Sequence, residues 1–218
     1  MQIPLAMLVA LHELDMPDDP EDLAVSHLSL NLRQRLGLSS VVLNQIRRYE
    51  ANRGDVSADE VASIFTLLAR RPDAAVIFDA AGHRIGRDSL DDRGLGRQIA
   101  TRLLPLGLRR RQAWGLAGKI ARRLCPDSPV RVEHGNAALV IEGGLPAHTT
   151  PGGSGCALLA GLIHEILDEY RAAGNDIIHF RCEARGDDDC TWEFADAGDE
   201  APPTTRPAGT SGGSVVRG

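Results

Sequence analysis

Apolar residues recur at helical spacing through much of the first half of the chain. Ser57 and Glu60 form the ends of a capping box, a pattern that starts a helix. The stretch around Val76 fits either a strand or one face of a helix, and we favour the helix. Helices are therefore predicted within 21–71, over 74–89, over 94–104 and over 111–124.

The pattern changes to short apolar runs after Pro129. Runs at 130–133 and 138–142 flank the turn sequence His134-Gly135-Asn136, which is typical of a hairpin. A long apolar helix over 156–170 then precedes two more strands, at 177–183 and 190–194. The order predicts the α+β class: an antiparallel sheet of about four strands packed with several helices, preceded by a helical N-terminal extension.

Shifts in composition divide the chain into four parts. The first twenty residues are acidic and contain two prolines, and beyond Asp196 the chain is rich in Pro, Thr, Ser and Gly. We predict an acidic arm over 1–20, a helical extension over 21–71, a second domain over 72–196, to which the family resemblance given below assigns ligand binding, and a disordered tail over 197–218.

Composition excludes several classes of protein. The chain has 218 residues, of which 43% are hydrophobic and 25% are charged, as in ordinary globular proteins. It has no apolar stretch of about 18 residues and no basic segment before its first apolar one, so we expect no membrane association and a cytoplasmic location. Four cysteines in such a chain are expected to be thiols or metal ligands rather than disulfides.

The positive charges gather in the middle of an acidic chain. The net charge is −6, whereas residues 84–123 hold ten arginines and Lys119 against three acids, a net charge of +8. A basic face can meet phosphate, an acidic partner or a second copy of the chain in a homodimer. The segment from Leu32 to Tyr49 loosely resembles a helix-turn-helix, but no base-reading residues are identifiable, so we do not favour DNA as a partner.

Three of the four cysteines, Cys156, Cys182 and Cys190, fall in the segment that contains the long apolar helix and the second hairpin. If Cys182 faces Cys190 across the second hairpin, Phe180 faces Trp192 and Ile178 faces Phe194, because side chains alternate along a strand. Such opposed thiols lie at a distance suited to two ligands of one metal. A cross-strand disulfide and plain buried thiols are the alternatives.

Cys156 and His179 complete a candidate metal site. Cys156 opens the long helix, where free N–H groups are expected to lower the pKa of its thiol. His179 lies three residues before Cys182, and in a regular strand these two side chains face opposite sides. A bulge or an early strand end near Arg181 is therefore needed if His179 is to ligate. The set Cys156, His179, Cys182 and Cys190 matches a common structural zinc set.

The same residues carry a resemblance to a known family. The helix that begins at Cys156, followed by His179-Phe-Arg-Cys182-Glu-Ala-Arg-Gly186-Asp-Asp-Asp-Cys190-Thr-Trp-Glu-Phe194, resembles the 4-vinyl reductase domain. That family includes a bacteriochlorophyll-synthesis protein and the effector-sensing domains of phenol-responsive activators. In its zinc-containing members three cysteines and an acidic residue hold the metal, and His179 falls at the position of the acid.

The resemblance implies a module that binds a hydrophobic small molecule between sheet and helices, as a sensor or carrier of an aromatic, acyl or tetrapyrrole ligand. Candidate lining residues, each of which can equally be plain core, are Phe78, His83, Trp114, Leu116 and Ile120. Alternatives are a role in bacteriochlorophyll or other tetrapyrrole synthesis and a DNA-binding regulator acting through the N-terminal helices. We favour a non-enzymatic role, because the chain has no dinucleotide-binding signature and a closed zinc site leaves no open position.

Overall fold

The computed structural model describes residues 3–16, 36–52, 56–91, 104–133, 137–172 and 177–194. The helices are α1 (Ile3–Asp15), α4 (Ser40–Ala51), α5 (Ala58–Leu68), α6 (Ala74–Asp91), α8 (Leu106–Leu124), α9 (Leu145–Thr149) and α10 (Ala157–Glu169), with 3-10 turns η1 (Leu36–Leu38), η2 (Pro151–Cys156) and η3 (Glu183–Arg185). The strands are β1 (Val130–Glu133), β2 (Ala138–Ile141), β3 (Ile177–Arg181) and β4 (Cys190–Phe194).

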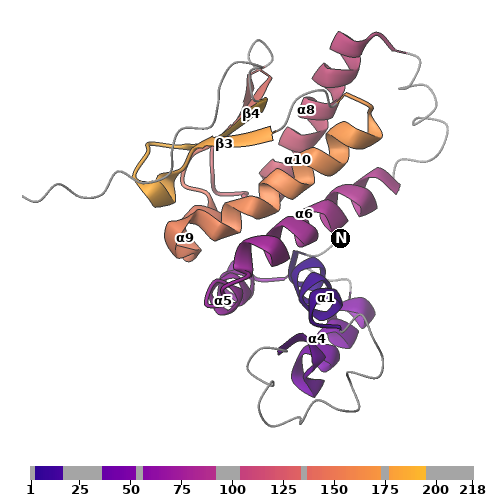
Figure 1. Ribbon diagram of the computed structural model, residues 1–218, viewed down its shortest axis with the longest axis vertical. Coiled ribbons are helices and arrows are strands. Elements are labelled where there is room, and N and C mark those ends of the chain that lie inside the picture. Colours follow the sequence, from indigo (N-terminus) through magenta and orange to yellow (C-terminus); the bar gives the residue numbers. More distant parts are fainter. Residues whose placement is uncertain are drawn as a thin grey trace, which may run out of the picture.

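The strands form one antiparallel sheet in the order β1-β2-β4-β3. Together with the helices this confirms the predicted α+β class with a four-stranded antiparallel sheet. Figure 1 shows α10 between the sheet and α6, with α1, α4 and α5 on the far side of α6. The hydrophobic core runs without a break through these layers, from Met7 of α1 to Trp192 of β4.

Most predicted elements are present. The favoured helix over 74–89 is confirmed as α6, and the Ser57 cap is confirmed, since its hydroxyl accepts a hydrogen bond from the Glu60 N–H at 3.2 Å. The helix predicted over 94–104 lies, apart from Leu104, outside the described residues, as do the 134–136 turn and the 197–218 tail. Between β2 and α10 the chain forms the short helix α9 and the turn η2.

The first residues of the chain belong to the core rather than to an arm. Over 3–15 they form α1, in which Met7 and Leu11 are fully buried. Its last residue, Asp15, is also buried and accepts two hydrogen bonds from the Arg71 guanidinium, at 2.8 and 3.0 Å. A two-pronged ion pair satisfies a buried carboxylate far better than a single contact, so it fixes the end of α1 against the start of α6.

Glycine allows α6 and α10 to pack at very short range. A Cβ atom on Gly82 of α6 would lie 2.0 Å from the Leu158 carbonyl oxygen, and one on Gly161 of α10 would lie 2.2 Å from the Asp79 carbonyl oxygen. The two backbones are therefore in direct contact, and α10 is held in a fixed position relative to the N-terminal helices.

We predict that Gly82→Ala lowers the free energy of unfolding by at least about 2 kcal/mol, because the added methyl must force the two helices apart. Gly115→Ala is the matched control, because a Cβ there meets no atom within 4 Å and alanine favours a helix by about 0.5–1 kcal/mol. Urea unfolding of both variants measures the difference. Equal effects of the two substitutions would contradict the close packing.

Candidate metal centre

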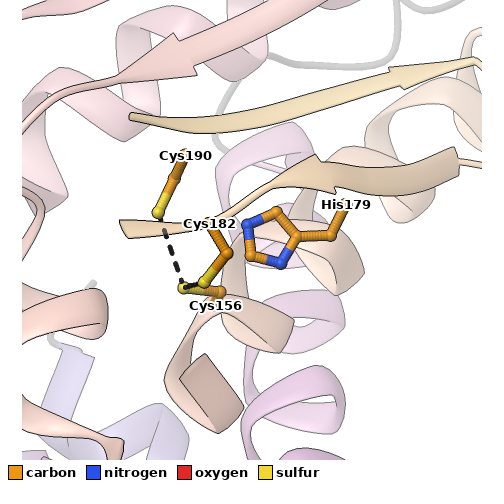
Figure 2. A group of neighbouring side chains, drawn as sticks. All are labelled: Cys156, His179, Cys182 and Cys190. Atoms are coloured by element: carbon orange, nitrogen blue, oxygen red, sulfur yellow. Dashed lines mark hydrogen bonds between the residues drawn. The ribbon is translucent and has the colours of Figure 1, made fainter. Parts of the chain in front are cut away.

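The four side chains proposed from the sequence converge on one point. The sulfur atoms of Cys156, Cys182 and Cys190 and a ring nitrogen of His179 all lie within 4.8 Å of one another (Figure 2). The Cys156 Sγ is 4.0 Å from the Cys182 Sγ and 3.9 Å from the Cys190 Sγ. Tetrahedral coordination with metal–sulfur bonds of about 2.3 Å requires sulfur–sulfur distances of about 3.8 Å, so this cluster can hold a metal ion.

Three separate segments supply these side chains. Cys156 ends η2 and caps α10, Cys190 begins β4, and Cys182 directly follows the last residue of β3. All three cysteines are buried, with exposed fractions of 1–2%. The cluster therefore lies where one edge of the sheet meets the start of α10.

The predicted pairing of the second hairpin holds next to the turn, where Arg181 faces Thr191, but it is wrong by one residue farther along the strands. His179, rather than Phe180, faces Trp192, and Ile177, rather than Ile178, faces Phe194. The cause is an irregularity between His179 and Arg181, which places Phe180 outside the regular pairing with its side chain 57% exposed. A pattern of alternating apolar residues cannot predict an extra residue of this kind.

This bulge also brings His179 and Cys182 to the same site. In a regular strand, residues three apart face opposite sides, and one extra residue cancels that difference. The requirement stated from the sequence, a bulge or an early strand end near Arg181, is confirmed in both respects, because β3 also ends at Arg181.

The His179 ring is held in the orientation that ligation requires. It stacks on the Trp192 indole with ring centroids 4.6 Å apart and planes 6° from parallel. Its Nε2 atom is buried without a hydrogen-bond partner in the described part of the chain. An unpartnered buried imidazole nitrogen is costly in a folded protein, and a metal ion beside three sulfur atoms would satisfy it.

Two of the neighbouring thiols, those of Cys156 and Cys190, differ in acidity. The hydrogen bond with Cys156 lowers the pKa of Cys190, with help from His179, and the same bond together with burial raises the pKa of Cys156. The sequence-based expectation of a lowered pKa at Cys156 is therefore wrong. Contact with a second thiol and loss of solvent outweigh the N-terminus of α10.

A glycine in η2 makes room for the sulfur atoms. Gly153 has a backbone φ of +76°, and a Cβ atom on it would lie 2.7 Å from the Cys182 Sγ and 3.8 Å from the Cys156 Sγ. Any other residue would be strained in this conformation and would push a methyl group into the cluster. The sequence pattern alone does not connect Gly153 with the site, because Cys182 is remote from it along the chain.

The acidic turn between β3 and β4 shapes the site as well. Asp187 accepts a hydrogen bond from the Cys182 N–H at 2.6 Å, and the Cys182 carbonyl accepts one from the Arg185 N–H at 2.8 Å. The chain reverses at Gly186, whose φ is +102°. Asp187 therefore fixes the backbone of a candidate ligand.

The candidate pocket residues contact different partners. Phe78 stacks on Phe65 of α5, with ring centroids 4.9 Å apart, and Trp114 meets Phe194 edge to face at 5.7 Å. Leu116 and Ile120 are buried on α8, 5% and 6% exposed. The half-buried His83 shares a hydrogen bond with the Glu165 carboxylate at 2.9 Å.

The chain matches no known protein family, no curated protein and no solved structure in the comparisons. No helix in the described residues is both long enough and apolar enough to cross a membrane. A function for this chain has therefore to be argued from the arrangement of these four side chains.

We predict that Gly153→Ala weakens metal binding at least tenfold, because its methyl group would overlap the Cys182 sulfur. Gly152→Ala is the matched control, since Gly152 has nearly the same φ, +73°, but a Cβ there meets no atom within 4 Å. Competition with a chromogenic zinc chelator measures both affinities. If the two variants bind zinc equally well, the close approach of Gly153 has no role in the site.

Proposed function

We propose that Cys156, His179, Cys182 and Cys190 bind one zinc ion, which joins the second hairpin to α10. The observation that carries this proposal is the convergence of three thiols and one unpartnered imidazole nitrogen within 4.8 Å. Thiolate and imidazole ligands in fourfold arrangement are those that structural zinc prefers. A reducing compartment such as the cytoplasm would keep the thiols available for the metal.

The proposed zinc has a mechanical role. Its four ligands come from the β3–β4 hairpin and from the N-terminus of α10, segments joined by no disulfide in the described residues. Four protein ligands fill a tetrahedral shell, so no position remains for a substrate. Because the thiols do not converge in the unfolded chain, the free energy of metal binding adds to the free energy of folding.

We further propose that the zinc-stabilised domain binds a hydrophobic small molecule, as a sensor or a carrier. Support comes from the resemblance of the segment from Cys156 to Phe194 to the 4-vinyl reductase domain. The packing of α8 and α10 against an antiparallel sheet is the kind of layered arrangement in which such ligands bind. On this proposal, zinc shapes the domain and takes no part in chemistry.

We expect the purified chain to contain one zinc per molecule and Cys182→Ser to lose most of it, because the remaining ligands cannot close the shell. If zinc is present at about 1,000 times its Kd, losing it lowers the free energy of unfolding by about 4 kcal/mol. Elemental analysis and thermal unfolding before and after chelation measure both effects.

Cys125→Ser is the control for the zinc experiment. Cys125 is also a buried thiol, 3% exposed, but it is not part of the cluster. This variant should keep its zinc even if replacement of a core residue lowers its stability. Full zinc content in Cys182→Ser, or equal loss from both variants, would refute the proposed site.

The ligand hypothesis can be tested through the two tryptophans of the chain, Trp114 and Trp192, which are both buried. We expect one of three probes, 4-methylphenol, palmitate or protoporphyrin IX, to change their fluorescence saturably. The zinc-free protein should respond less, because the hairpin that carries Trp192 is then less well fixed. If none of the three probes binds to zinc-loaded protein, the chain is not a sensor or carrier of these ligand classes. That result would not contradict the proposed zinc site.

A further inference from the structure

The outer face of α8 is a basic surface that the proposed metal site does not use. Helical spacing brings the exposed residues Arg111, Lys119, Arg122 and Arg123 to one side of this helix. The helix contains no acidic residue along its 19 positions. In Figure 1, α8 lies at the edge of the described part of the molecule.

The cations of α8 differ from six arginines elsewhere in the fold, which form ion pairs with carboxylates. In the described residues, none of the α8 cations forms an ion pair, and the polar contacts of Arg110 and Arg122 are to the carbonyl oxygens of Ala172 and Val130. Arginines outside α8 that pair with carboxylates are Arg48, Arg71, Arg84, Arg87, Arg131 and Arg181. Within the described residues, the exposed cations of α8 thus remain without a carboxylate partner, although the net charge of the chain is −6.

Gly115 lies in the middle of the same face, one turn after Arg111 and one turn before Lys119. A Cβ atom there would meet nothing within 4 Å, so no contact inside the described chain requires glycine. Glycine in a helix interior is unfavourable relative to alanine. Its presence at this position is explained if the surface of a partner approaches the helix backbone closely.

The distribution of charged and apolar residues on α8 argues against three kinds of partner: a membrane, a second copy of the chain and another protein. A membrane-bound helix inserts its apolar side, but the apolar side of α8, with Trp114 and Ile120, is buried in this protein's own core. A second copy docking through the same face would oppose cations with cations. A protein partner usually requires apolar or aromatic anchors, and the exposed apolar residues of α8, Leu106 and Leu108, lie at its start rather than between the cations.

We propose that the outer face of α8 binds the phosphate backbone of double-stranded nucleic acid without sequence preference. This reverses the expectation from the sequence that DNA is not a partner, and it needs no base-reading residues. Arg111 and Arg123 are about 18 Å apart along the helix axis, and a DNA duplex carries one negative charge about every 1.7 Å. The face therefore spans several phosphates. Contacts to phosphate need cations and close approach, and this face supplies both.

The test measures binding of the full chain to a fluorescein-labelled random-sequence duplex of about 20 base pairs, by anisotropy, between about 50 and 200 mM salt. Arg111→Gln/Lys119→Gln should weaken binding at least tenfold and reduce the slope of log affinity against log salt by about 1.8. Arg47→Gln/Arg70→Gln removes the same charge from exposed positions outside α8 and should change neither.

A second variant probes the centre of the face without removing a cation. Gly115→Gln should weaken duplex binding while the unfolding temperature stays equal or rises, because glutamine favours the helix but blocks close approach. Unchanged binding by this variant would contradict contact at the helix backbone.

Three other outcomes would overturn the proposal. They are no duplex binding at about 50 mM salt, loss of binding in Arg47→Gln/Arg70→Gln instead, and binding to phosphatidylglycerol vesicles without binding to the duplex. None of these outcomes bears on the zinc content, so this proposal and the proposed metal site fail independently.

Discussion

The bulge between His179 and Arg181 is the constraint on which the cysteine–histidine cluster depends. Without it, His179 and Cys182 would face opposite sides of the sheet. With it, the His179 ring stacks on Trp192 and the Cys182 sulfur lies beside that of Cys156. The exposure of Phe180 is the local cost of this arrangement, because the extra residue points an apolar ring towards solvent.

The cysteine–histidine cluster is connected by packing to the N-terminal helices. Cys156 caps α10, and α10 touches α6 backbone to backbone at Gly82 and Gly161. The helix α6 in turn packs against α1, whose end is fixed by the Asp15–Arg71 ion pair. The candidate metal ligands thus belong to the same continuous core as the N-terminal helices. Loosening the hairpin would disrupt the candidate metal site. It would also remove the packing contacts that the buried side chains of Cys156 and Trp192 make.

Sequence patterns predicted the parts of this fold that depend on local rules. Helical periodicity gave α6 and α10, and cysteine and histidine spacing gave the four residues that converge. The register of β3 was missed because its apolar alternation is satisfied equally well by a pairing shifted by one residue. The role of Gly153 was missed because it depends on its distance from Cys182, which is remote in sequence.

The two faces of α8 show how one helix can connect the hairpin that carries candidate metal ligands with the surface. On its inner side, Trp114 meets Phe194 of β4 edge to face, and the Arg110 guanidinium lies 4.9 Å from the centre of the same ring. Gly118 lets β1 approach so closely that a Cβ there would lie 2.3 Å from the Val132 Cγ2 atom. The position of the basic outer face is therefore set by the sheet to which the candidate metal ligands Cys190 and His179 belong. Order in the hairpin and the placement of these cations are parts of one packing arrangement, because Phe194 ends the strand that Cys190 begins.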